Sequence, residues 1–159
     1  MAIMGATRFG FELPLLLVAA FRGLVDALHV ELAARGHPEA RPLHGFALQA
    51  VGPDGVTASE LARRLGVSKQ AAAKTAAALD RLGYVVREPD PSDARAIRLR
   101  RSPLGDELLA LSAVTFARLR QRWVDELGSE RVAALEDDLQ RMVVSAGGVN
   151  LADLPGWLR

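Results

Sequence analysis

The sequence has no cysteine among its 159 residues. This absence excludes a disulfide framework, a thiol nucleophile, a cysteine-based redox sensor and any metal site built on thiolates. Aromatic residues are also scarce, at 5%, whereas half of the residues are hydrophobic and a quarter are charged. That balance is typical of a globular protein, and the length suits one domain with a core of its own.

Lysine is rare as well: Lys69 and Lys74 are the only two, against 18 arginines. The net charge of +1 hides an asymmetry, because residues 57–101 contain ten Lys and Arg but only five Asp and Glu. That segment therefore carries +5 and the rest of the chain −4. A basic segment between acidic flanks indicates a local site for a polyanion.

The sequence also lacks a long unbroken apolar run. The longest one near the N-terminus, Leu13–Phe21, is too short to cross a bilayer. Glu12 precedes it, Arg22 follows it, and no clear small-x-small cleavage site is present. We therefore expect this run to belong to a helix of a cytoplasmic globular protein, with no membrane partner.

Apolar periodicity and turn residues predict a mainly α (α+β) fold. Helices are expected over residues 13–34, 43–51, 57–65, 68–82, 103–127 and 129–144, and paired strands over 84–86 and 96–100, joined by a polar loop of about ten residues. In the second strand Ile97 and Leu99 alternate with Arg98 and Arg100, so one face is apolar and the other basic. Leu108, Leu111, Phe116, Leu119, Trp123, Val132, Leu135, Leu139 and Met142 are the candidate buried positions of the last two helices.

The segment "LARRLGVSKQAAAKTAAALDRLG" (61–83) contains two helices in close succession. Gly66 ends the first in the usual manner of a C-terminal glycine, and Ser68 is placed to cap the second. Two helices with such a tight connection are the helix-turn-helix pattern. In the second helix, residues at helical spacing form a stripe that we expect to be buried: Ala72, Thr75, Ala76 and Leu79.

The opposite side of that second helix carries polar and very small residues: Ser68 at its cap, then Lys69, Gln70, Ala73, Lys74 and Ala77. Glutamine can bond to adenine through two hydrogen bonds, and lysine binds guanine or phosphate. Alanines between them let a helix approach the floor of a DNA groove. The alternative is that an alanine-rich helix is simply a good helix former in a tight core.

Residues 57–105, "TASELARRLGVSKQAAAKTAAALDRLGYVVREPDPSDARAIRLRRSPLG", resemble the MarR family of bacterial transcriptional regulators. The resemblance rests on the helix spacing, the "GVSKQA" and "LDRLGYV" segments and the "DARA" sequence, all in register. It implies a winged helix-turn-helix in one domain (1–145), with DNA bound by 57–101 and a homodimer formed by long helices at 13–34 and 103–145. Residues 146–159 would form a C-terminal tail.

The resemblance also implies roles for the wing. Arg95 would lie at the tip and enter the minor groove, whose negative potential attracts arginine, and Asp93 would orient it or brace the loop. Arg87 and Arg98, together with Arg100, would lie near phosphates; the alternative for each is a solvated surface charge. The sequence departs from the family pattern at Ala77, Ala78 and Ala94, which puts the strength and sequence preference of binding in question.

Two further partners follow from the family. The outer helices are more apolar than one small core requires, which favours a homodimer on a pseudo-palindromic operator over a monomer. Many members bind a small aromatic or anionic effector, and the candidate residues here are Phe21, His29, His44, Phe46 and Phe116. Their spacing does not distinguish a ligand pocket from ordinary core.

The sequence offers no catalytic, metal-binding or cofactor motif. The three histidines are eight and seven residues apart, which is not the spacing of paired ligands on a helix, and "GPDG" (52–55) lacks the lysine of a phosphate loop. We therefore expect a DNA-binding regulator, a repressor released by a small ligand, and not an enzyme. The alternatives are a winged-helix protein-interaction module and a DNA-binding protein without a ligand.

Overall fold

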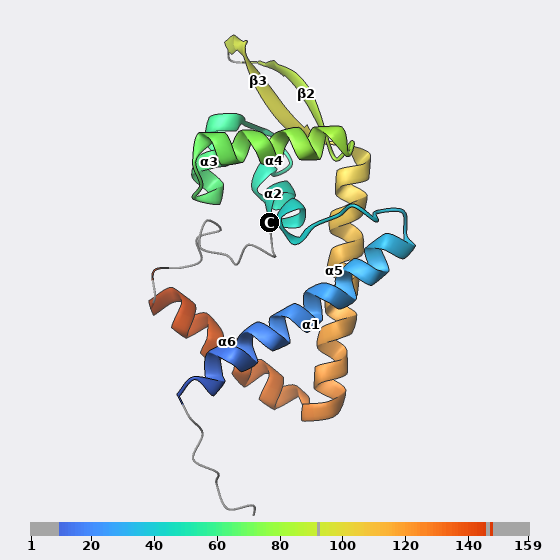
Figure 1. Cartoon of the computed structure of the whole chain (residues 1–159), viewed down its shortest axis with the longest axis vertical. Helices are drawn as coiled ribbons and strands as arrows, with labels where there is room; N and C mark the ends of the chain where they lie inside the picture. The colour runs from blue at the N-terminus through green and yellow to red at the C-terminus, as the bar shows by residue number, and fades with distance from the viewer. Residues whose placement is uncertain (1–9, 92, 146, 148–159) are drawn as a thin grey trace, which may run out of the picture.

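The computed structural model describes residues 10–91, 93–145 and 147. Its elements are, in chain order, α1 (Glu12–Ala34), α2 (Pro42–Val51), β1 (Val56–Thr57), α3 (Ala58–Leu65), α4 (Lys69–Arg81), β2 (Val85–Asp90), β3 (Asp93–Arg101), α5 (Pro103–Leu127) and α6 (Ser129–Ser145). The strands form an antiparallel sheet in the order β1-β3-β2. Figure 1 shows the β2-β3 hairpin and α4 at one end of the molecule and α6 at the other. The fold is the predicted winged helix-turn-helix with long outer helices.

The core lies at the end of the molecule that carries the hairpin. It joins the second half of α1 to α2, α3, α4, the sheet and the first turns of α5. Its largest fully buried side chains include Leu48, Leu61, Leu65, Leu79 and Leu108. These leucines come from α2, α3, α4 and α5, and they belong to one common core. The packing of these leucines therefore holds the short helices together.

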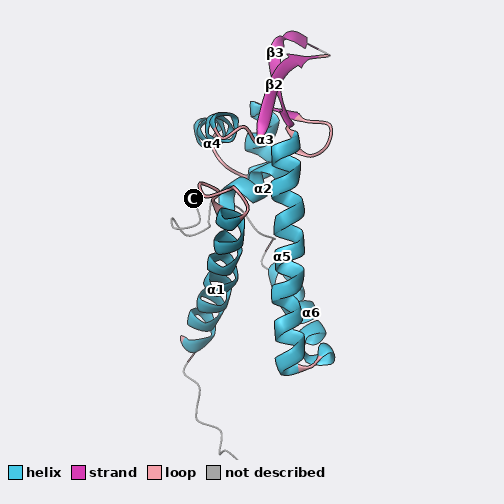
Figure 2. Ribbon diagram, turned by 90° about the vertical axis from the view of Figure 1, so that its right-hand side faces the viewer, coloured by secondary structure: helices cyan, strands magenta, loops and turns pink. Residues whose placement is uncertain are grey.

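The predicted helices are confirmed to within a residue or so at each end, but the prediction of the strands was wrong in extent. The ten-residue loop does not exist: β2 reaches Asp90 and β3 begins at Asp93. This hairpin projects from the body (Figure 2), so its residues need no apolar alternation, and two prolines and several charges fit there. The two-residue strand β1 was not predicted either; it pairs with β3 at Leu99 and Arg98.

The start of α5 is fixed to the root of the hairpin. The Ser102 hydroxyl donates to the Gly83 carbonyl at 2.5 Å, and the Ser102 backbone N–H donates to the Tyr84 carbonyl at 3.0 Å. A Cβ at Gly105 would collide with that same Tyr84 carbonyl oxygen, so glycine is required for this close approach. The end of α4, the hairpin and α5 therefore form one connected unit.

The long helices bury fewer of the predicted core positions. Leu108, Leu119 and Val132 are buried as expected, and Leu111 and Trp123 are partly buried. Four other positions that were predicted to be buried are exposed in the single chain, so the prediction was wrong there: Phe116, Leu135, Leu139 and Met142. Helical periodicity identified an apolar face correctly, but no other part of the described chain covers it.

Helix α1 is long and apolar enough to cross a membrane, by length and composition alone. Its most apolar window has a mean hydropathy of 1.7, and 11% of that window is buried in the chain. The unbroken run of the sequence is shorter than the helix, which continues past an ion pair between Arg22 and Asp26 at 3.6 Å. Apolar helices of soluble proteins pass the same test.

The predicted tail, residues 146–159, lies outside the described residues except for Gly147. The same holds for residues 1–9 at the start of the predicted domain.

Candidate nucleic-acid interface

Two N-terminal caps set the angle between α3 and α4. At the start of α3, Thr57 Oγ1 accepts from the Glu60 backbone N–H at 3.3 Å, and the Glu60 carboxylate accepts from the Thr57 backbone N–H at 2.8 Å. These bonds from Thr57 hold the pKa of Glu60 below its usual value. Gly66 then adopts a left-handed conformation, and Ser68 Oγ accepts from the Ala71 N–H at 3.2 Å. The turn is thus closed at both ends by the residues that the sequence indicated.

The buried stripe of α4 is confirmed: Ala72, Thr75, Ala76 and Leu79 are all buried. The opposite side is exposed at every predicted position, namely Ser68, Lys69, Gln70, Ala73, Lys74 and Ala77. Neither lysine forms an ion pair with any residue that the structure describes. Helix α4 therefore presents a low, polar and cationic surface on the outside of the molecule (Figure 1).

The tip of the hairpin carries Arg95, which is exposed. Of the two roles expected for Asp93, the structure supports bracing: its carboxylate accepts from the Arg95 backbone N–H at 3.0 Å. The bond shapes the backbone near the tip and uses only the backbone N–H of Arg95, not its guanidinium. The side chain of Ala94 lies outside the described residues.

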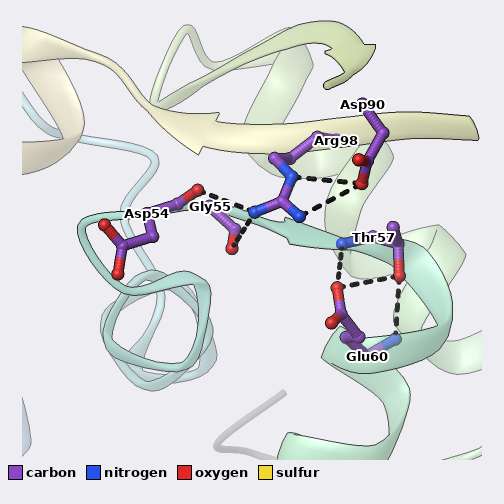
Figure 3. Close-up of polar contacts among 6 residues, drawn as sticks. All are labelled: Asp54, Gly55, Thr57, Glu60, Asp90 and Arg98. Carbon is purple, nitrogen blue, oxygen red and sulfur yellow. Dashed lines mark hydrogen bonds and ion pairs between the residues drawn. The ribbon is translucent and has the colours of Figure 1, made fainter. Parts of the chain in front are cut away.

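The other arginines of the hairpin have partners within the fold, which the sequence did not indicate. Arg87 Nε lies 2.7 Å from Asp80 Oδ2 on the last turn of α4, and Arg100 lies 3.9 Å from Glu88. The side chain of Arg98 is largely enclosed, at 24% exposed. It bonds to Asp90 and to two backbone carbonyls, as Figure 3 shows.

A cavity of about 330 Å³ lies between α1, α2 and α5. Four of the five predicted ligand residues line it: Phe21, His29, Phe46 and Phe116. The sequence analysis missed its other polar lining residues, Arg41, Gln49 and Ser112. Burial and then the nearby Arg41 lower the pKa of His29, whose Nε2 has no hydrogen-bond partner within the described part of the chain. The cavity combines aromatic walls with one cation and neutral polar groups.

His44, the fifth predicted ligand residue, does not line this cavity. It is buried in the first turn of α2, where its Nδ1 accepts from the Arg41 backbone N–H at 3.1 Å. Burial, followed by the charges of Arg41 and Arg81, lowers its pKa to about 4. Its ring lies beside Tyr84, whose hydroxyl is hydrogen-bonded to the buried His37 at 3.1 Å. His44 is thus a neutral part of the core.

A larger hollow of about 800 Å³ lies between α1, α5 and α6, and we call it the apolar groove. Its lining is almost entirely apolar, with Arg120 and Glu136 as the exceptions: Leu13, Leu16, Leu17, Ala20, Phe21, Leu24, Phe116, Ala117, Arg120, Trp123, Val132, Leu135, Glu136 and Leu139. Arg120 and Glu136 pair with each other through two hydrogen bonds of 2.7 Å. The groove therefore presents an apolar surface with its charges already neutralised.

Comparison with known proteins agrees with this geometry. The sequence model of the MarR family matches residues 46–96, which contain α3, α4 and most of the hairpin. No curated protein sequence matches the chain.

Three solved structures show the same fold at low identity. One is FabT of Streptococcus pneumoniae in complex with DNA, with 18% identity, a TM-score of 0.69, and 82% of this chain and 92% of that chain covered. MarR of E. coli in its apo form has 21% identity and a TM-score of 0.61 over 82% and 96%. PcaV of Streptomyces coelicolor in complex with its natural ligand has 22% identity and a TM-score of 0.60 over 92% and 99%. The helix-turn-helix and most of the wing thus match the sequence model of the MarR family, and the chain shares the fold of these three structures.

Proposed function

We propose that this protein is a homodimeric, sequence-specific DNA-binding regulator of transcription, a repressor that a small ligand releases from its operator. The observation that carries the proposal is the surface of α4, whose exposed side holds the only two lysines and otherwise almost no bulk. The DNA complex of FabT, which shares the fold, supports it.

On α4 the arrangement suits the major groove. Lys69, Gln70 and Lys74 are exposed, and the alanines between them would allow the helix to lie close to the base edges. The N-terminus of α4, where Ser68 is the cap, also carries the positive end of the helix dipole at the start of this surface. We propose Ser68 and Ala73 as further contacts on the same side.

Next to α4, the hairpin suits the adjacent minor groove. Arg95 is exposed near the tip, and Asp93 fixes the backbone there. Arginine is drawn to a narrow minor groove because its negative potential is strongest there. Arg87 and Arg100 are about half exposed, so we propose that they contact phosphates beside their own ion-pair partners.

We propose that the apolar groove is the site where a second copy of the chain binds. The groove is lined by leucines that helical periodicity predicts to be buried. These leucines are exposed in the single chain. A two-fold dimer would cover these faces and place two α4 helices on one side of the DNA, about one turn apart. On this account α1 is a dimerisation helix, and the protein is cytoplasmic and not membrane-bound.

The cavity between α1, α2 and α5 is the proposed effector site. Phe21, Phe46 and Phe116 offer apolar contact to a ring, and Arg41 offers a cation to an acidic group. We therefore propose a small aromatic anion as effector. The ligand complex of PcaV, another protein of this fold, supports the presence of a ligand site. We propose no catalytic role and no cofactor, since the MarR family consists of transcriptional regulators.

The test is selection of bound DNA from a random duplex library at two salt concentrations, with fluorescence anisotropy on the recovered sites. We expect an inverted repeat with half-sites about one helical turn apart. Affinity should fall steeply with salt, with a slope of about −0.9 per phosphate neutralised. A folded dimer that binds no DNA at low salt would refute the proposal and favour a protein-interaction module.

Two variants separate base contacts from phosphate contacts. Lys74→Ala should weaken binding, and a base contact should also relax the preference at one position of the half-site, by about 1–3 kcal/mol. Arg95→Ala should cost affinity mainly where the flanking sequence is A·T-rich. Equal loss on all flanks would contradict a minor-groove contact by Arg95.

A further inference from the structure

Arg98 joins three separate segments of the winged end. Its Nε and Nη2 donate to the same carboxylate oxygen of Asp90, at 3.2 and 3.1 Å. Its Nη1 donates to the carbonyls of Asp54 and Gly55, at 3.0 and 3.3 Å. Figure 3 shows the guanidinium lying between the end of β2 on one side and the turn before β1 on the other. One side chain on the central strand thus ties the outer hairpin to the turn that follows α2.

Two features favour this contact: the burial of Asp90 and the glycine at position 55. The side chain of Asp90 is 4% exposed, so its charge is withdrawn from water and held by Arg98. At Gly55 the backbone has a φ of +75°, and a Cβ there would lie 2.6 Å from the Leu99 carbonyl and 3.2 Å from Arg98 Cγ. Glycine therefore allows the turn to approach β3 closely enough for its carbonyls to reach the guanidinium.

Besides Arg98, the described attachments of the hairpin to the body include strand β1 and the ion pair of Arg87 with Asp80 on α4. Strand β1 has only two residues, and they pair with Leu99 and Arg98. Beyond that pairing β2 and β3 extend away from the body (Figure 2), and the register between them shifts at Pro89 and Asp90. Asp90 is the last residue of β2, and Arg98 connects it to the turn at Asp54.

We propose that Arg98 and Asp90 are positioning residues for DNA binding: together they fix the direction of the hairpin and so the place of Arg95. This inference rests on the proposed function. It replaces the expected phosphate contact of Arg98 with a different role, because the guanidinium donates inward to a buried carboxylate and two carbonyls. Asp90, which the sequence analysis did not single out, acquires a role in binding a polyanion although it is itself an anion.

That last point provides the sharpest test. Removing a negative charge near DNA strengthens binding if only electrostatic attraction matters. Asp90→Asn should instead weaken binding by about tenfold or more, because an uncharged amide holds Arg98 less firmly. Glu88→Gln is the matched control: it removes a carboxylate from the same strand, one that is 38% exposed and 3.9 Å from Arg100. It should leave affinity unchanged or raise it by less than about threefold. Equal behaviour of the two variants would overturn the proposal.

Arg98→Lys and Arg98→Gln test whether Arg98 positions the wing or contacts DNA directly. Lysine keeps the charge but cannot bond to Asp90 and both carbonyls at once. Positioning predicts that both variants lose about as much affinity as Asp90→Asn, and that the loss falls below about threefold when Arg95 is already alanine. A phosphate contact predicts that lysine retains most of the affinity and that the loss persists without Arg95.

Amide hydrogen exchange on the free protein separates this inference from the proposed function. Asp90→Asn and Arg98→Gln should raise exchange in β2 and β3 relative to the wild type, whereas Glu88→Gln should not. Wild-type protein that binds no DNA would refute the proposed function, and the exchange result would still decide whether the pair holds the hairpin. Unchanged exchange in all variants would overturn the positioning role.

Discussion

In α4, Ala72, Ala76 and Leu79 are buried by the rest of the chain, whereas in α6 Leu139 and Met142 are 37% and 65% exposed. Both helices have their apolar residues at helical spacing, and both have a polar opposite side. The winged end completes its core within one chain. The end with the long helices does not, and it leaves the apolar groove open to solvent.

The difference shows that the same sequence pattern can specify two kinds of partner. A stripe of small residues such as that of α4 packs closely against neighbouring helices of one domain. A stripe of leucines on long helices covers more area than the chain itself can bury, and so favours a second copy. In the proposed dimer, folding and dimerisation therefore belong to opposite ends, and the first two of the following four experiments test that division.

The largest effect is expected from a charge in the apolar groove. Leu16→Glu places a carboxylate at a position that is 57% exposed in the chain but would be enclosed in the dimer. We expect the dimer dissociation constant to rise at least about a thousandfold, roughly 4 kcal/mol, because an unpaired charge would be buried. Sedimentation velocity over a range of concentrations measures this. Val86→Glu, at a position 46% exposed on β2 and away from the long helices, is the control and should remain dimeric.

The second experiment compares one leucine from each end. Leu79→Ala removes a fully buried side chain and should cost about 3 kcal/mol of unfolding free energy at any protein concentration. Leu139→Ala should cost less than about 1 kcal/mol in dilute protein and more as the concentration rises, because its burial requires the partner. Urea unfolding at two protein concentrations distinguishes them. The division would be wrong if both losses were independent of concentration.

A third effect depends on pH and comes from His44, which is buried beside Tyr84. Because burial lowers the pKa of His44 to about 4, the folded protein keeps this imidazole neutral where the unfolded chain protonates it near 6.5. Stability is therefore complete above pH 6.5 and falls as the pH drops toward 4, by at most about 1.4 kcal/mol per pH unit from this group. Unfolding measured at pH 7, 6 and 5 should show the slope.

His44→Gln is the control for that slope. It removes the contribution of His44 and leaves the smaller one from His29, whose pKa is also lowered by burial. An unchanged slope in His44→Gln would show that other groups cause the acid sensitivity.

The smallest effect concerns the hydrogen bond between Tyr84 and His37. Tyr84→Phe keeps the ring but leaves a buried histidine nitrogen without its partner, at a cost of about 1 kcal/mol of unfolding free energy. The double variant Tyr84→Phe with His37→Leu should recover part of that loss, since no polar atom is then left unpaired. Thermal unfolding of the three variants measures both steps. If the losses in unfolding free energy of the two single variants simply added in the double variant, the hydrogen bond between Tyr84 and His37 would not contribute to stability.

Local signals predicted the helix-turn-helix well. The spacing of Ala72, Ala76 and Leu79 determines which side of α4 is buried, and Gly66 and Ser68 mark where one helix ends and the next begins. Each of these signals acts within a few residues. The same is true of the Ser102 cap and the proline that start α5.

What the sequence did not indicate depends on contacts between distant residues. Arg98 bonds to a carbonyl 44 positions away, and no pattern around it distinguishes a brace from a solvated charge. The strands were predicted too short because residues 87–91 are all charged residues or prolines, which give no apolar alternation. His44 looked like a ligand residue because composition alone does not show that its ring faces Tyr84.

The length of α5 has a mechanical consequence. Its N-cap, Ser102, is hydrogen-bonded to Gly83 and Tyr84 at the root of the hairpin, its middle lines the cavity between α1, α2 and α5, and its far half borders the apolar groove. A helix of 25 residues is about 37 Å long, so it behaves as a lever. A tilt of about 5° at one end moves the other by about 3 Å, close to the spacing of about 3.4 Å between successive base pairs. In the proposed dimer on DNA, a small angular change between the two copies would therefore shift the hairpin by about one base-pair step.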